Sequence, residues 1–211
     1  MFSVGVKLGK GGSWWIAIGF FLLTAAPGMW YPALPNILKA QGIEWVLPYA
    51  FAVGPLASLF SPLIFGSMAD YRFSAQKLVG TLSLLGAGFL GMAFYSLYMG
   101  WGAWWYLGFQ VLNALLGAPM WSLVSTVTLA NVDNAQKKFP LFRVWGSVGW
   151  VIAGLLVSWM GWDSSPMAGI AAAGIRVIFG LSCYMMPDTP PQGKLESGKP
   201  NWRKNLGLDA L

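Results

Sequence analysis

Three residues of one predicted helix combine groups that can bind a polar ligand with a planar ring. Arg143, Ser147 and Trp150 have the spacing i, i+4, i+7, which places a guanidinium, a hydroxyl and an indole on one face of an α-helix. The two polar groups can orient a ligand through hydrogen bonds, and the indole can stack on its ring. The spacing therefore favours a binding site for a small ligand that carries both hydroxyls and a flat ring.

An alternative interpretation assigns the same residues to the membrane environment. Arg143 can extend to the lipid headgroups while Trp150 packs against lipid. An Arg at the centre of a bilayer costs about 2.5–3.5 kcal/mol on insertion scales, so depth decides between the two interpretations. The sequence leaves both open. Gly146 and Gly149, on a neighbouring face, predict the close approach of another helix.

The composition of the 211 residues places these side chains in a membrane protein. Hydrophobic residues make up 56% and charged residues 9%, whereas a soluble domain carries about 25% charged residues. There is no His, and the single Cys183 lies in an apolar run, so a metal site or a disulfide framework is not expected. All seven acids fall outside the apolar segments. We therefore predict an all-α integral membrane protein that is not an enzyme.

Six segments are long and apolar enough to cross a bilayer, which takes about 20 residues. They are 14–34, 45–68, 78–98, 104–130, 141–160 and 167–186. A tight hairpin around Gly100 joins the third and fourth segments. Pro27, Pro32 and Pro35 predict a bent or broken helix at one end of the first segment, and Pro119 predicts a kink in the fourth. The predicted division is a cytoplasmic amino terminus (1–13), a six-helix bundle (14–186) and a cytoplasmic tail (187–211).

The distribution of Lys and Arg predicts the orientation. The loops on one side hold only Lys39, whereas ten basic residues lie on the other side. These ten are Lys7, Lys10, Arg72, Lys77, Lys137, Lys138, Lys194, Lys199, Arg203 and Lys204. An excess of this kind marks the cytoplasmic side. We expect a multi-pass protein of the cell (inner or plasma) membrane with both termini in the cytoplasm.

Several polar or aromatic residues inside the segments have more than one interpretation. Asn113 favours a hydrogen bond between helices over a ligand contact. Trp30 and Tyr31 can contact a substrate or belong to an interfacial aromatic belt, and both remain open. Arg176 is an intramembrane charge without an evident acidic partner, so it either faces a cavity or meets a partner from elsewhere.

The predicted loop between the second and third segments carries Gly66, Asp70 and Arg72 in the pattern Gly-x-x-x-Asp-x-Arg. Gly66 suits close packing, Asp70 can accept hydrogen bonds from free amides at a helix start, and Arg72 can pair with an acid or a headgroup. The alternative is a solvated turn whose charges set topology. Six segments with this loop resemble the amino-terminal half of a major facilitator superfamily transporter, although the later residues of the loop depart from that pattern.

Within that superfamily the chain resembles the nucleoside:proton symporter family. The resemblance rests on segments that occur in order along most of the chain: 67–70 with 74–75, Asn113 with Pro119, 139–140, 143–149, 187–191 and 206–210. It implies that Arg143, Ser147 and Trp150 contribute to nucleoside binding. The family commonly has Thr and Phe at the last two positions. Ser147 keeps the hydroxyl and Trp150 keeps a stacking face, but the larger indole changes the size of the pocket.

The resemblance implies a nucleoside transporter that works by proton-coupled symport and alternating access, with the proton gradient as energy source and no cofactor. Its expected partners are a nucleoside, the lipid bilayer and a carboxy-terminal six-helix half, without nucleic acid. Family members have twelve spans, and their second half supplies further binding residues and a proton-carrying acid. Two alternatives stay open. One is a superfamily transporter for a sugar or modified nucleoside, and the other is a truncated, non-transporting membrane protein.

Overall fold

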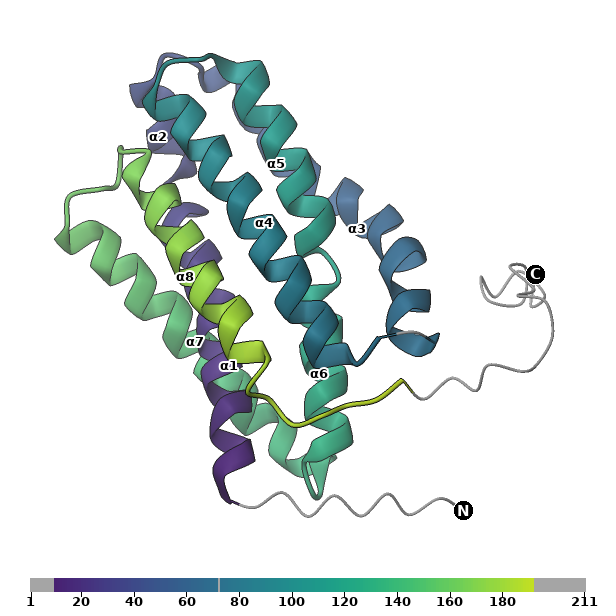
Figure 1. The fold of residues 1–211 in the computed structure, drawn as a ribbon. Helices are drawn as coiled ribbons and strands as arrows, with labels where there is room; N and C mark the ends of the chain where they lie inside the picture. The colour runs from purple at the N-terminus through teal and green to yellow at the C-terminus, as the bar shows by residue number, and fades with distance from the viewer. Residues whose placement is uncertain (1–9, 72, 192–211) are drawn as a thin grey trace, which may run out of the picture.

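The computed structural model describes residues 10–71 and 73–191, and every regular element in this part is a helix (Figure 1). The elements are α1 (Lys10–Trp30), α2 (Leu34–Ala40), η1 (Glu44–Val46), α3 (Leu47–Tyr71), α4 (Ala75–Tyr98), α5 (Ala103–Gly117), α6 (Met120–Asn131), α7 (Ala135–Trp159) and α8 (Met167–Cys183). The predicted all-α class is therefore confirmed.

Four helical stretches of the described residues are long and apolar enough to cross a membrane. They are Trp14–Ala40, Ala75–Tyr98, Ala103–Asn131 and Lys137–Trp159, and α8 is a shorter apolar helix of 17 residues. Large apolar side chains also cover the outside of the bundle, with Trp159 83% and Leu59 66% exposed to the surroundings. Such a surface suits lipid rather than water, so the chain is an integral membrane protein.

The long helices lie side by side in one bundle (Figure 1). α1 packs most extensively against α7, and α4 packs most extensively against α8. Two apolar clusters fill the interior. One includes Phe94 and Tyr106, and the other includes Phe20 and Phe179. The helices around these clusters hold the residues of the candidate site.

Two predicted helix breaks are observed at proline-containing segments. α1 continues through Pro27 and ends at Trp30, just before Pro32, and α2 resumes at Leu34. α5 ends at Gly117 and α6 begins at Met120, with Pro119 as its N-cap. Proline lacks an N–H and its ring crowds the preceding turn, so an α-helix bends or ends there. The break in the segment 104–130 divides it into two helices, whereas the break in the segment 14–34 lies near its end.

The predicted hairpin around Gly100 is also confirmed, because α4 and α5 are joined by residues 99–102. Gly100 has a φ of 68°, a left-handed conformation that glycine adopts without strain. The Trp101 N–H donates to the Ser96 carbonyl oxygen at 2.9 Å, and the Gly100 N–H donates to the Leu97 carbonyl oxygen at 3.1 Å. This pair of bonds is the Schellman arrangement that ends an α-helix at a glycine.

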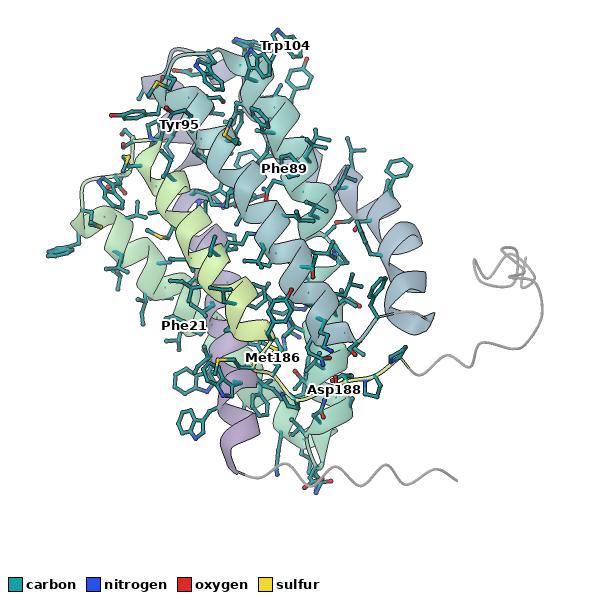
Figure 2. All side chains as sticks on the ribbon, viewed as in Figure 1. Phe21, Phe89, Tyr95, Trp104, Met186 and Asp188 are labelled. Atoms are coloured by element: carbon teal, nitrogen blue, oxygen red, sulfur yellow. The ribbon has the colours of Figure 1, made fainter. Side chains whose placement is uncertain are left out.

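Exposed aromatic residues gather where α4 ends and α5 begins. Trp45 contacts Trp104 at a ring-centroid distance of 5.7 Å, and Tyr95 contacts Trp101 at 5.8 Å. Figure 2 shows Tyr95 and Trp104 at one end of the bundle, with Met186 and Asp188 at the other end. Trp and Tyr concentrate where a membrane meets water, so this cluster marks one boundary of the membrane-embedded part.

The loop motif differs from its predicted position. We expected the second segment to end at residue 68 and Asp70 to lie in a loop, but α3 continues to Tyr71. Gly66 and Asp70 therefore belong to the last turns of that helix. Their further surroundings, and Arg72 entirely, lie outside the described residues, so the structural role of this motif stays a prediction.

The first residues after α8 pack on the bundle rather than extending away from it. Thr189 is buried, its N–H donates to Gln76 Oε1 at 2.9 Å, and its carbonyl oxygen accepts from the Ala75 N–H at 3.1 Å. Asn131 Nδ2 donates to the Thr189 hydroxyl at 2.7 Å. The start of the predicted tail thereby connects the beginning of α4 to the end of α6.

Candidate ligand-binding site

The three residues of the predicted binding face line one cavity. Arg143, Ser147 and Trp150 of α7 surround a volume of about 580 Å³ together with Thr24 of α1 and Trp121 of α6. Small-molecule sites typically enclose about 300–1,000 Å³. The helical spacing therefore brings a guanidinium, a hydroxyl and an indole to a space of suitable size.

A close seam between α1 and α7 holds this face in place. A Cβ atom at Gly149 would lie 3.0 Å from the Phe21 carbonyl carbon, and one at Gly146 would lie 3.2 Å from Thr24 Cγ2. The Thr24 hydroxyl donates a hydrogen bond across the seam to the Gly146 carbonyl oxygen. The predicted close approach at both glycines is confirmed, and it leaves α1 little freedom to move relative to α7.

Aromatic rings flank the polar groups of the cavity. Arg143 Cζ lies 5.4 Å from the centroid of the Trp121 ring, within the range of a cation–π contact. The Trp150 ring lies 6.4 Å from the Tyr31 ring in an edge-to-face arrangement.

The three residues lie at different depths along the apolar stretch of α7. Arg143 follows Lys137, the first residue of that stretch, by six residues, which corresponds to about 9 Å along the helix axis. Ser147 and Trp150 lie near the middle of the apolar stretch Lys137–Trp159.

A second cavity of about 370 Å³ adjoins the first. Thr24, Trp121 and Trp150 line both, so the two volumes meet at shared walls. Trp30 lines the second cavity and is only 7% exposed. Its indole is therefore inside the bundle and not on the outer surface, where a residue of an interfacial aromatic belt would lie. Tyr31 is 40% exposed and contacts Trp30 and Phe51.

Arg176 of α8 lines the second cavity and is only 8% exposed. Its Nη1 donates to Asn113 Oδ1 of α5, and its Nη2 lies 3.7 Å from the Met120 sulfur. The predicted hydrogen bond of Asn113 between helices is thus confirmed. The sequence did not identify Arg176 as its partner, although an intramembrane Asn and an intramembrane Arg without a nearby acid are a signal for such a pair.

The helices and the cavities together define the class of protein, an integral membrane protein with polar and aromatic residues inside its helix bundle. Within that class the chain belongs to the family described as nucleoside H+ symporter, whose sequence profile matches residues 15–211. The resemblance noted on the sequence is confirmed at the level of family.

Curated relatives agree with this assignment. The chain is 31% identical over 192 residues to the putative nucleoside transporter YegT of Escherichia coli K12, covering 87% of this chain and 44% of the relative. It is 27% identical over 212 residues to the nucleoside permease NupG of the same organism, covering 95% of this chain and 44% of the relative. The chain thus spans less than half the length of these relatives, which are transporters rather than enzymes.

Solved structures share the fold. A crystal structure of a mutant of the nucleoside transporter NupG superposes with a TM-score of 0.79, covering 93% of this chain and 49% of that chain at 23% identity. A second NupG crystal structure gives a TM-score of 0.75 over the same shares. The bundle of α1 to α8 therefore has the fold of about half of that transporter.

Proposed function

We propose that this chain is the amino-terminal, six-helix half of a major facilitator nucleoside transporter that takes up nucleosides with protons by alternating access. The observation that carries the proposal is the 580 Å³ cavity that Arg143, Ser147 and Trp150 line together. Membership of the nucleoside H+ symporter family supports the substrate class and the coupling ion. The coverage of less than half of each relative supports the role of one half.

In this proposal each of the three residues makes a different contact with the substrate. The Arg143 guanidinium and the Ser147 hydroxyl form hydrogen bonds with the nucleoside, and the Trp150 indole stacks on its base. A carboxy-terminal half would close the other side of the cavity near the middle of the bilayer. The proton gradient supplies the energy, and no cofactor takes part.

The proposed orientation has both termini in the cytoplasm of a cell whose inner or plasma membrane holds the protein. It rests on ten basic residues on one side against Lys39 on the other. Six spans follow if α3 and α8 also cross the bilayer beside the four stretches that meet the length and hydropathy requirement. Labelling of single cysteines introduced at Lys39 and Lys138 would test the orientation, since only the former should react from outside.

Uptake of radiolabelled uridine and adenosine tests the function in cells that lack their own nucleoside transporters. The intact gene product should raise uptake, a protonophore should abolish the increase, and R143M should reduce uptake at least tenfold. K138M is the matched control, because Lys138 is exposed on the same helix and does not line the cavity. Absence of uptake even with a complete second half restored would overturn the nucleoside assignment, and inhibition by sugars alone would favour another solute.

A further inference from the structure

Arg176 is a buried cation whose contacts leave most of its hydrogen-bonding capacity unused. A guanidinium carries five N–H donors. Among the described residues, Nη1 donates to Asn113 Oδ1, Nη2 contacts the Met120 sulfur, and Nε has no partner. These partners are neutral. A charge inside a membrane protein is costly unless it is compensated, and such residues commonly mark a path or site for a ligand.

The surrounding helices leave space for this guanidinium and orient one acceptor toward it. A Cβ atom at Gly86 of α4 would lie 2.7 Å from Arg176 Cζ, and one at Gly117 of α5 would lie 3.3 Å from Nη2. A side chain at Gly86 would therefore displace the guanidinium, and one at Gly117 would crowd it. Asn113 is oriented in turn, because its Nδ2 donates to Gln110 Oε1 at 3.2 Å and both amides are buried. The amide oxygen of Asn113 is thereby left to face Arg176.

The position of Arg176 connects it to the proposed site. It lines the 370 Å³ cavity, which shares Thr24, Trp121 and Trp150 with the 580 Å³ cavity that contains Arg143. Arg143 and Arg176 therefore line two adjoining cavities with three shared lining residues, and we refer to the two cavities together as the hollow. Neither the sequence pattern nor the family resemblance pointed to Arg176 as a binding residue.

The side chains that line this hollow are rich in hydrogen-bond donors. Arg and Trp side chains can donate but cannot accept, and the acceptors among the lining side chains are the hydroxyls of Thr24 and Ser147 and the weakly accepting sulfur of Met120. The donor-only residues are Trp30, Trp121, Arg143, Trp150 and Arg176. A ligand group that meets these donors must supply acceptor atoms, since a donor placed against them would leave both groups unpaired.

We propose that Arg176 is a second ligand-binding residue, which donates a hydrogen bond to an exocyclic carbonyl oxygen of the nucleoside base. This half of the site consequently selects oxo-bearing bases over bases that lack that oxygen. The proposal rests on the function proposed above. A charge-assisted hydrogen bond is shorter and stronger than a neutral one, and Gly86, Gly117 and Asn113 hold the guanidinium in position for it.

Inosine and nebularine form a suitable pair of probes, because they differ only at the N1–C6 edge of the base, where inosine carries the 6-oxo group and N1–H and nebularine carries C6–H and an unprotonated N1. Isothermal titration calorimetry of the intact protein in lipid nanodiscs gives the Kd of each. The wild-type protein should bind inosine about ten- to a hundredfold more tightly than nebularine. R176M should bring this ratio close to one while changing the Kd for nebularine about threefold or less. K138M, which removes an exposed charge, should retain the wild-type ratio.

R176K covers the case in which R176M does not fold. Lysine keeps the charge but loses the planar fork of donors, so the preference for inosine should fall at least about threefold with unchanged thermal unfolding. Equal weakening of both probes in either variant would make Arg176 a structural residue and overturn the inference, as would equal affinities in the wild-type protein. In both cases the proposed function would stand. Failure of the wild-type protein to bind any nucleoside would instead overturn the proposed function, and this inference with it.

Discussion

Arg143 and Arg176 line adjoining cavities of this bundle, but their side chains are held in position by different contacts. Arg143 is exposed to its cavity and lies over the face of Trp121, on a helix that also supplies Ser147 and Trp150. Arg176 is buried between α4, α5 and α8, and its main partner is the amide of Asn113. The first site is therefore encoded along one helix. The second exists only after three helices have packed.

This difference predicts how each arginine responds to changes nearby. The Arg143 face depends on the seam between α1 and α7, because that seam fixes the rotation of α7. The Arg176 guanidinium depends on the absence of two side chains and on one oriented amide. The following substitutions test these dependences in order of decreasing predicted cost.

Gly149→Ala should disrupt the seam beside Arg143. The added Cβ would meet backbone atoms of Phe21, which cannot move without shifting α1. Overpacking of this kind costs about 3 kcal/mol at the upper end of the usual range. Denaturation of the purified protein in mixed detergent micelles measures the change. Gly154→Ala is the control on the same helix, because a Cβ there meets nothing within 4 Å. Equal stability of the two variants would contradict the tight seam.

Asn113→Ala should remove the acceptor of the buried Arg176 guanidinium. Loss of a hydrogen bond to a charged group costs about 1.5–3 kcal/mol, so the free energy of unfolding should fall by about 2 kcal/mol. Asn36→Ala on α2 is the control, because Asn36 is exposed. A change no larger than that of the control would show that Asn113 does not stabilise Arg176.

Gly86→Ala should displace the Arg176 guanidinium at a smaller cost. The new Cβ would meet the end of a long side chain, which can move more easily than backbone. We expect a loss of about 1 kcal/mol, together with a weaker preference for inosine in calorimetry. Gly88→Ala, two residues away with nothing within 4 Å, should leave that preference unchanged. If the preference for inosine were unchanged in both variants, the position of the Arg176 guanidinium would not depend on the space at Gly86.

Trp121→Phe should have the smallest effect, because it exchanges one aromatic ring for a weaker cation–π partner of Arg143. The contact contributes about 0.5–1 kcal/mol at an exposed position. A double-mutant cycle with R143M isolates this coupling free energy from the loss of other contacts of Trp121, such as its edge-to-face contact with Phe20. A coupling of zero would show that the ring does not hold Arg143.

The features that the sequence predicted depend on local chemistry. The helices break at Pro32 and Pro119, and Gly100 makes the hairpin. The i, i+4, i+7 spacing places Arg143, Ser147 and Trp150 on one face. These results follow from a few neighbouring residues.

The features that the sequence did not predict depend on how separate helices are rotated and packed. Asn113 was expected to bond another helix, but nothing local shows that its partner is Arg176. Trp30 is buried against Phe94 instead of joining an aromatic belt. α3 extends past Asp70, because a helix end without a proline or glycine signal is poorly marked in the sequence.

The affinity for uridine shows whether the α7 face of Arg143, Ser147 and Trp150 binds a nucleoside. Calorimetry would compare the wild-type protein, S147A, S147T and K138M in lipid nanodiscs. We predict that S147A weakens binding about tenfold through loss of one hydrogen bond, that S147T restores it because threonine returns the hydroxyl, and that K138M matches the wild type. Equal affinities of S147A and the wild type, or no binding of uridine by any of the four proteins, would contradict the account.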